Sequence, residues 1–303
     1  MIRSILFIAA LALSATATTG FAAEGTFDKT LSVAGTPTVS VATGSGYIHV
    51  TPGPDNQFHV IGHVHARAGM FSASSDEDIV KQIVASPPIA QSGNTITVAM
   101  PHADSDLYRN VSIDYDVTTP RATTLTAHTG SGGIQIAGIQ GVASAETGSG
   151  SIQLSLAGPG DVKANTGSGS IHIDGLNGSL RAGTGSGSID VSGKPTAEWR
   201  LSTGSGSIRL KLGNDARFTL DAETGSGSVR VDQPILMQGS LNRHHISGTV
   251  NGGGPNIRAT TGSGDITING TSTVGQLQDS NSLHVPGATD CVDNPTQSAC
   301  PRN

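Results

Sequence analysis

The phrase TGSGSI, at residues 147–152, 166–171 and 184–189, decides the fold, because variants of it return at a nearly constant interval. The pattern Thr-Gly-Ser-Gly-x-Ile/Val begins at Thr129, Thr147, Thr166, Thr184, Thr203, Thr224 and Thr261. The intervals between these positions are 18, 19, 18, 19, 21 and 37 residues. A fixed period of this length is typical of repeat proteins, in which each unit buries its apolar face against its neighbours.

Two further copies extend the pattern. A complete copy begins at Thr43, far from the others. Inside the long final interval, residues 247–250 (SGTV) stand 21 positions after residues 226–229 (SGSV). We interpret residues 247–250 as a degenerate copy, which carries the period to the end of the array.

Apolar and polar residues alternate on both sides of each phrase. The apolar ones stand four and two positions before the Thr, as Val162 and Ala164 do, and five and seven positions after it, as Ile171 and Ile173 do. Alternation predicts β-strands, and the Gly residues between them suit a corner that needs positive φ or close backbone approach. The sequence therefore predicts an all-β fold. It is a single-stranded, β-helix-like β-solenoid, with two main strands per coil of about 18–21 residues, stacked in parallel at about 4.8 Å.

The chain divides into a signal peptide, a β-rich leading segment or cap continuous with the solenoid, the repeat array, and a polar tail: residues 1–22, 23–120, 121–270 and 271–303. The first part combines Arg3, an apolar run and a small-residue cleavage site, as secretory signal peptides do. No later apolar run is long enough to cross a membrane. We therefore expect export without a membrane anchor, to the periplasm or to the cell surface.

The leading segment and the tail carry separate expectations. In the leading segment, alternation predicts strands at residues 47–50, 58–66, 95–100 and 111–117, and residues 70–84 include a short helix with acidic residues in its first turn. In the tail, Cys291 and Cys300 are the two cysteines of the chain. In an oxidising compartment we expect them to form a local disulfide.

The repeats also resemble a known family. The Thr-Gly-Ser-Gly-Ser-Ile phrases, together with VSIDYDV at residues 111–117 followed by Pro120 and the phrase at Thr129, are similar to the bacterial "putative adhesin" β-strand-repeat family of exported proteins. The likeness covers residues 33–268. It implies a β-solenoid in the cell envelope, and it supplies no catalytic residues.

Composition and motifs argue against several functions. The formal net charge of −6 disfavours nucleic-acid binding. The sequence has no phosphate-binding loop and no nucleophile elbow. A calcium-binding β-roll needs an Asp in each turn, whereas the corresponding position is acidic only at Asp265. We expect the outward Asp190 and Asp221 to form ion pairs across coils with Arg209 and Arg200, which is not a catalytic arrangement.

A row of histidines is the weak candidate for a metal site. His59, His63 and His65 share one face of a predicted strand, with His49 on the strand before it. Alternating imidazoles can bind a transition metal. No Cys or carboxylate stands beside them in the sequence, so we interpret the row as a solvated strand face and expect no cofactor.

A column of cations is the candidate for ligand binding. Lys163, Arg181, Arg200 and Arg258 each stand three positions before a repeat Thr, and the first three should stack on consecutive coils. Cations about 5 Å apart repel unless an anion lies across them. An acidic polysaccharide, a teichoic-type phosphate or a lipopolysaccharide fits this surface. The alternative is that the flexible, solvated side chains simply splay apart.

The sequence thus predicts an exported, non-enzymatic envelope solenoid that is adhesin-like or structural and binds glycan or other envelope components through flat strand faces. Two alternatives remain. One is a β-helix enzyme acting on glycans as a lyase or hydrolase, which should show a groove with clustered carboxylates. The other is a periplasmic ligand-binding or stress-associated module.

Overall fold

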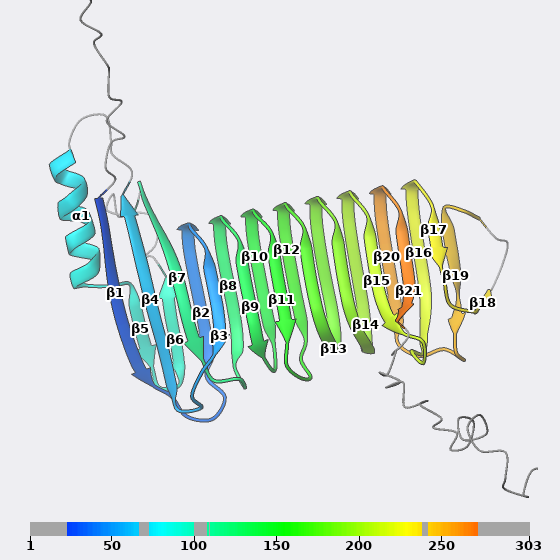
Figure 1. Cartoon of the computed structure of the whole chain (residues 1–303), viewed down its shortest axis with the longest axis horizontal. Coiled ribbons are helices and arrows are strands. Elements are labelled where there is room, and N and C mark those ends of the chain that lie inside the picture. The colour runs from blue at the N-terminus through cyan, green and yellow to red at the C-terminus, as the bar shows by residue number, and fades with distance from the viewer. Residues whose placement is uncertain (1–22, 67–72, 100–107, 109, 238–241, 272–303) are drawn as a thin grey trace, which may run out of the picture. The chain divides into compact units, whose positions relative to one another are not determined.

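The computed structural model describes residues 23–66, 73–99, 108, 110–237 and 242–271. The predicted signal peptide and the tail with Cys291 and Cys300 lie outside these residues. The described part is nearly all-β, with one helix, and its strands form two long walls joined at Gly-rich corners (Figure 1). The predicted β-solenoid with two strands per coil is confirmed.

We call the strands that precede the Thr-Gly-Ser-Gly corner, together with the strands that pair with them, wall A. In order along the sheet, wall A consists of β5 (Ile89–Ser92), β6 (Thr95–Ala99), β2 (Thr38–Ser45), β8 (Thr124–Ser131), β10 (Ala143–Ser149), β12 (Val162–Ser168), the second halves of β13 (Ile171–Ser186) and β14 (Ile189–Ser205), β20 (Asn256–Ser263), β16 (Phe218–Ser226), β19 (His245–Val250) and β18 (Ile235–Met237).

Wall B contains the strands that follow the corner. In order, it consists of β1 (Ala23–Ser32), β4 (Gln57–Ala66), β7 (Val111–Thr119), β3 (Ile48–Pro52), β9 (Ile134–Ile139), β11 (Ile152–Leu156), the first halves of β13 and β14, β15 (Ile208–Gly213), β21 (Ile266–Thr271) and β17 (Val229–Val231).

The core lies between the two walls. The apolar residues four and two positions before each repeat Thr are buried, as are the first residues of the strands that follow the corner; Trp199 and Ile208 are fully buried examples. Each large aliphatic side chain that leaves water stabilises the fold by about 1.5–3 kcal/mol. Because neighbouring coils repeat the same side chains in register, these contributions add up along the array.

The corners are held by glycines and by a ladder of threonine hydroxyls. The second Gly of each phrase has positive φ, for example 143° at Gly169, and a Cβ there would collide with the carbonyl oxygen of Gly150 on the adjacent coil. The repeat Thr is buried, and Thr184 Oγ1 donates a hydrogen bond of 2.9 Å to the Gly169 carbonyl oxygen. The same bond recurs at Thr129, Thr147, Thr166, Thr203, Thr224 and Thr261. The buried repeat threonines thus each donate a hydrogen bond to a neighbouring coil, which helps to fix the register.

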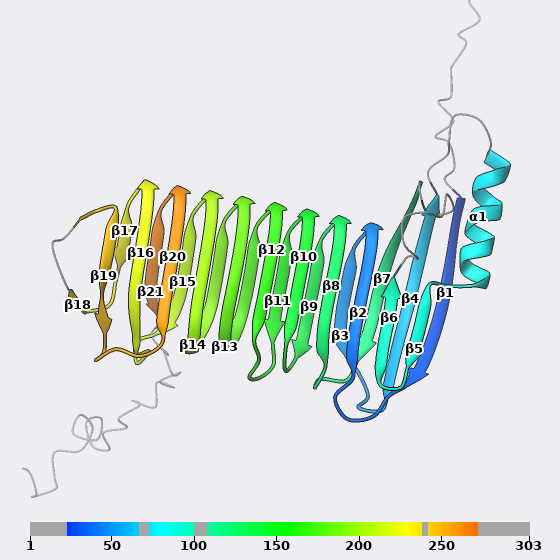
Figure 2. The ribbon, with the colours of Figure 1, turned by 180° about the vertical axis from the view of Figure 1, so that it is seen from behind.

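The order of coils in space differs from the order in the chain at both ends. At the N-terminal end, β2 pairs with β8 on one side and with the later strand β6 on the other. At the C-terminal end, Thr261 lies in register with both Thr203 and Thr224. The coil β20–β21 is therefore inserted between β14–β15 and β16–β17, as both views show (Figures 1 and 2).

The interpretation of residues 247–250 as a degenerate repeat is wrong. They belong to β19, which runs antiparallel to β16 and places Ser247 opposite Asp221 and Gly248 opposite Leu220. A coil of the array would run parallel. The long interval before Thr261 therefore contains the hairpin β18–β19, which closes wall A.

The leading segment forms the other end of the same compact unit. Its predicted strands are present, and β4 pairs antiparallel with both β1 and β7. The predicted helix is also present as α1 (Ala73–Ala85), with Asp76 in its first turn. Val80 and Ile83 of α1 are buried, and Val80 lies so close to Gly25 of β1 that a Cβ would not fit there. The helix thus covers the apolar end of the core.

Candidate functional site

The cationic column, which we define as Lys163, Arg181, Arg200 and Arg258, lies on the outer face of wall A. The strand registers pair Lys163 with Arg181, Arg181 with Arg200, and Arg200 with Arg258. Because neighbouring strands are about 4.8 Å apart, four cations follow one another across four coils. The insertion of β20 adds Arg258 directly to the three residues that were expected to be adjacent.

Acidic residues flank the column and pair with three of its members. Lys163 Nζ lies 2.6 Å from Glu146 Oε1, Arg200 Nε lies 2.9 Å from Glu198 Oε1, and Arg258 Nη2 lies 2.8 Å from Asp221 Oδ2: three exposed contacts on three different coils. Arg181 has no ion-pair partner among the described residues. Among the described residues, Arg181 is therefore the member of the column whose guanidinium group has no carboxylate partner.

The pKa values of the flanking carboxyl groups reflect these contacts. The hydrogen bond from Lys163 lowers the pKa of Glu146. Partial burial acts to raise the pKa of Asp221, but hydrogen bonds from His245 and Arg258 outweigh it, and the net shift is downward. Both carboxylates stay ionised at neutral pH, so the column is a row of cations with a charged border.

A groove of about 360 Å³ runs beside the column. It is lined by backbone and side chains of Val142, Asp161, Val162, Lys163, Ser179, Leu180, Arg181, Glu198 and Arg200. Val142 is half exposed there, and Asp161 accepts hydrogen bonds from Ser179 that lower its pKa. The groove thus offers apolar, anionic and cationic contacts at the centre of the column.

One of the two expected cross-coil ion pairs is present. Arg209 Nη1 lies 3.4 Å from Asp190 Oδ1 on the neighbouring coil. The expectation that Asp221 pairs with Arg200 is wrong, because the inserted strand β20 separates them and brings Arg258 to Asp221 instead.

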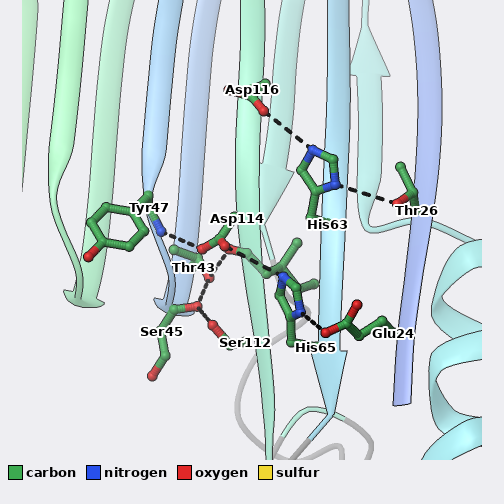
Figure 3. A network of polar contacts seen from close by, with 11 residues as sticks. Glu24, Thr26, Thr43, Ser45, Tyr47, His63, His65, Ser112, Asp114 and Asp116 are labelled. Atoms are coloured by element: carbon green, nitrogen blue, oxygen red, sulfur yellow. Dashed lines mark hydrogen bonds and ion pairs between the residues drawn. The ribbon is translucent and has the colours of Figure 1, made fainter. Parts of the chain in front are cut away.

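The histidine row lies on the outer face of wall B. His59, His63 and His65 come from β4 and His49 comes from β3, with β7 between these two strands. Figure 3 shows that His63 and His65 point toward carboxylates of neighbouring strands. All four imidazoles are partly exposed.

Carboxylates do lie beside the histidines in the folded protein, contrary to the expectation from the sequence. Asp116 of β7 lies between two of them, with Oδ1 3.2 Å from His49 Nδ1 and Oδ2 3.4 Å from His63 Nε2. The other imidazoles face acidic residues as well: His65 lies 3.6 Å from Asp114 and 3.5 Å from Glu24, and His59 lies 2.8 Å from Asp28. β1 and β7 supply these carboxylates.

The carboxylates alternate with imidazoles as pairs and do not converge on one point. Among the described residues, no three His, Cys, Asp or Glu side chains are arranged to hold a metal ion. Antiparallel pairing of β4 with two strands placed the acids there, and the alternation of Asp114 and Asp116 on β7 was the signal that could have indicated them. Within the same residues, no helix is long and apolar enough to cross a membrane.

Comparison with solved structures shows distant similarity. A "putative cell adhesion protein" from Clostridium sporogenes is 13% identical, with 82% of this chain and all of that one covered, at a TM-score of 0.35. A "putative adhesin" from Bacteroides fragilis is 12% identical (82% and 97% covered, TM-score 0.33), and a "putative lipid binding protein" from Parabacteroides distasonis is 10% identical (80% and 96% covered, TM-score 0.33).

No curated protein matches the chain. A family model does, and it spans residues 38–269, from the start of β2 into β21, so that it includes the whole run of parallel coils but not β1. The description of that model is Toastrack DUF4097, and it covers most of the sequence. The chain therefore belongs to the Toastrack DUF4097 family.

Proposed function

We propose that the protein is an exported, non-enzymatic solenoid of the cell envelope, adhesin-like or structural, that binds an anionic polymer such as an acidic polysaccharide along the cationic column. The observation that carries this proposal is the uninterrupted register of Lys163, Arg181, Arg200 and Arg258, with Arg181 unpaired among the described residues. A polymer with repeating negative charges can contact several of these coils at once.

The energetics favour such a ligand. The ion pairs at Lys163, Arg200 and Arg258 are exposed, and pairs of this kind contribute only about 0–1 kcal/mol each. A polyanion can therefore displace the flanking carboxylates at small cost. The backbone of these strands is already ordered, so binding has to order only the ligand and the Lys and Arg side chains, at about 0.5–1.5 kcal/mol for each side chain.

The direct test compares two charge-neutralised double variants. Arg181→Gln with Arg200→Gln removes two cations from wall A, and Arg209→Gln with Arg230→Gln removes two from wall B. The controls match, because Arg200 and Arg209 are 53% and 51% exposed and each pairs with one carboxylate. We expect the wall A variant to bind polygalacturonate about tenfold more weakly, since two exposed contacts together amount to about 1.4 kcal/mol.

The wall B variant should bind within about twofold of the unmodified protein, because its cationic column is intact. The two variants have the same net charge, so comparing them separates the effect of the column from that of overall charge. Equal losses in both variants would mean that overall charge, and not the column, attracts the polymer. Unchanged binding in the wall A variant would contradict the proposed function.

The proposed location has its own test. The pattern in residues 1–22 supports export, and protease accessibility on intact and opened cells separates the two destinations. Digestion in intact cells is the expected result for an adhesin-like surface. Protection until the envelope is opened would confine the protein to the periplasm and exclude the adhesin-like role.

A further inference from the structure

A second surface stands out at the residue that follows each Thr-Gly-Ser-Gly phrase. This residue is Ser in most copies: Ser151, Ser170, Ser188, Ser207 and Ser228. It is Tyr47 in the first copy, Gly133 in the copy at Thr129 and Asp265 in the copy at Thr261. Tyr47 and Gly133 are direct neighbours, because β2 and β3 pair in register with β8 and β9.

Tyr47 and Gly133 are in direct contact. A Cβ at Gly133 would lie 3.2 Å from Cδ1 and 3.3 Å from Cε1 of Tyr47, so the tyrosine ring lies across the glycine. The backbone N–H of Tyr47 donates a 2.7 Å hydrogen bond to Asp114 Oδ1, which fixes the start of β3 (Figure 3). Tyr47 nevertheless stays 66% exposed. Gly133 thus supports the ring while most of the ring surface remains open to solvent.

The ring borders a pocket with a largely apolar lining and a few hydrogen-bonding side chains. Besides Tyr47 and Gly133, the lining consists of Ile48, His49, Ile134, Gln135, Ser151 and Gln153. The registers place His49 beside Gln135 and Gln135 beside Gln153, so that the outer face presents one hydrogen-bonding side chain per coil. No Asp, Glu, Lys or Arg lines this pocket, in contrast to the groove on wall A.

We infer that this pocket binds a neutral sugar ring, with the apolar face of the sugar stacked on Tyr47 and its hydroxyl groups bonded to Gln135, Gln153 and Ser151. A sugar offers both an apolar face and many hydroxyls, which matches an exposed aromatic ring beside amides that donate and accept. The lining offers no Asp, Glu, Lys or Arg to a charged ligand. A neutral glycan can contact both amides, because Gln135 and Gln153 lie on neighbouring strands about 4.8 Å apart.

Covering Gly133 does not by itself account for the tyrosine. The other coils have Ser or, at Asp265, an acidic residue at this position, and a ring that remains two-thirds exposed buries little apolar surface. The site lies on wall B and involves none of the cations of wall A. Its test therefore succeeds or fails independently of the proposed function.

The experiment uses Tyr47→Trp as a reporter in the full chain. Trp199 is the single native tryptophan, fully buried and hydrogen-bonded through Nε1 to the Gly178 carbonyl oxygen, so it will not respond to a surface ligand. We titrate with three neutral probes, cellohexaose, maltohexaose and chitohexaose. The expected result is a saturable change in emission and reduced acrylamide quenching with at least one probe. No saturable change with any of them up to millimolar concentration would overturn the inference.

Calorimetry on the chain without the reporter then assigns the contacts. Tyr47→Ala should weaken binding of the responding probe at least tenfold, and Tyr47→Phe should retain it, because the ring face makes the contact. Gly133→Ser should also weaken it, because its Cβ pushes against the ring. Leu236→Ala, at an equally exposed apolar residue on β18, is the matched control and should have no effect. Binding that survives Tyr47→Ala would place the sugar elsewhere and refute the site.

Discussion

The middle of the array and its two ends follow different rules. From β8 to β14, each coil stacks on the coil that precedes it in the chain, at intervals of 18 or 19 residues. At the ends, the order in space differs from the order in the chain. The strands β6–β7 lie outside β2–β3 and not between β2–β3 and β8–β9, and β16–β17 lie outside β20–β21 although they precede that coil in the chain. A local repeat thus defines the middle of the array, whereas pairing between strands far apart in the chain defines where the array stops.

The strand directions also differ between the two regions. The middle is parallel throughout, while each end adds antiparallel strands: β4 against β7, and β19 against β16. An exposed parallel edge has unpaired N–H and C=O groups, which can pair with further strands, including those of other molecules. An antiparallel strand cannot accept another coil in the same register, so the ends limit the length of the array.

The largest expected effect comes from truncation after Asp232. The remaining residues 218–231 would lose both neighbours of β16, namely β19 and the inserted β20. We expect hydrogen exchange to show strongly reduced protection in this segment, because β16 would keep neither of its native partners and could dock only on the vacant edge of β14.

A chain truncated after Thr271 is the control and should keep full protection, since it retains every described strand. If the coils stacked in chain order, β16 would rest on β14 and survive the shorter truncation. Full protection of residues 218–231 in the shorter chain would show that β16 stacks on β14 as well as on β20, and would contradict the expected requirement for the inserted coil.

A glycine substitution sharpens the contrast at the level of single residues. Gly169→Ala, in the middle, combines a φ of 143° with a collision against the Gly150 carbonyl oxygen. We expect it to lower the free energy of unfolding by about 3 kcal/mol or more, measured by urea denaturation.

Gly93→Ala, in the turn between β5 and β6, has a φ of 60° and no atom within 4 Å of the added Cβ. Its cost should be about 1 kcal/mol, for the left-handed backbone alone. Equal losses in the two variants would show that the close approach of coils adds nothing to the need for glycine.

The smallest expected effect concerns pH. Hydrogen bonds from the Ser228 hydroxyl and backbone N–H, at 2.9 and 2.8 Å, lower the pKa of Asp265 on the inserted coil. A lowered folded-state pKa contributes stability that is present above the unfolded value of about 3.9 and is lost as pH falls through the folded value. Asp265→Asn should therefore make the melting temperature slightly less dependent on pH below about 5.

The equivalent position in the middle provides the reciprocal test. There the Ser188 N–H donates to Ser170 Oγ at 3.4 Å. Ser170→Asp should introduce the acid dependence that Asp265→Asn removes. A melting temperature whose acid dependence is unchanged in both variants would show that this contact does not couple protonation to folding.

Much of the fold follows from the sequence because the repeat is local. Alternation located both walls, and the glycines at Thr+1 and Thr+3 indicated the corners. The insertion of β20–β21 could not be predicted, because the inward pair Ile257 and Ala259 is equivalent to Leu220 and Ala222 and either pair can stack on wall A. Residues 247–250 were misassigned because an alternating pattern of apolar and polar residues does not indicate whether a strand is parallel or antiparallel to its neighbour.

The candidate sites divide in the same way. The cationic column could be predicted because every member occupies one position of the repeat. The acidic partners of the histidines could not, since they come from β1 and β7 through pairing across more than thirty residues. The Tyr47–Gly133 contact was also missed, because it joins two coils that are far apart in the chain.

The inserted coil has a consequence for how the molecule folds. A solenoid can in principle fold progressively from one end, with each coil docking on the coil that precedes it in the chain. Here the growing edge formed by β14 and β15 must stay vacant until residues 256–271 are available, although β16 offers the same pattern earlier in the chain. Premature docking of β16 there would be a kinetic trap that has to open before the native order can form. We therefore expect docking of the last coil, and not of the regular ones, to limit the rate of folding.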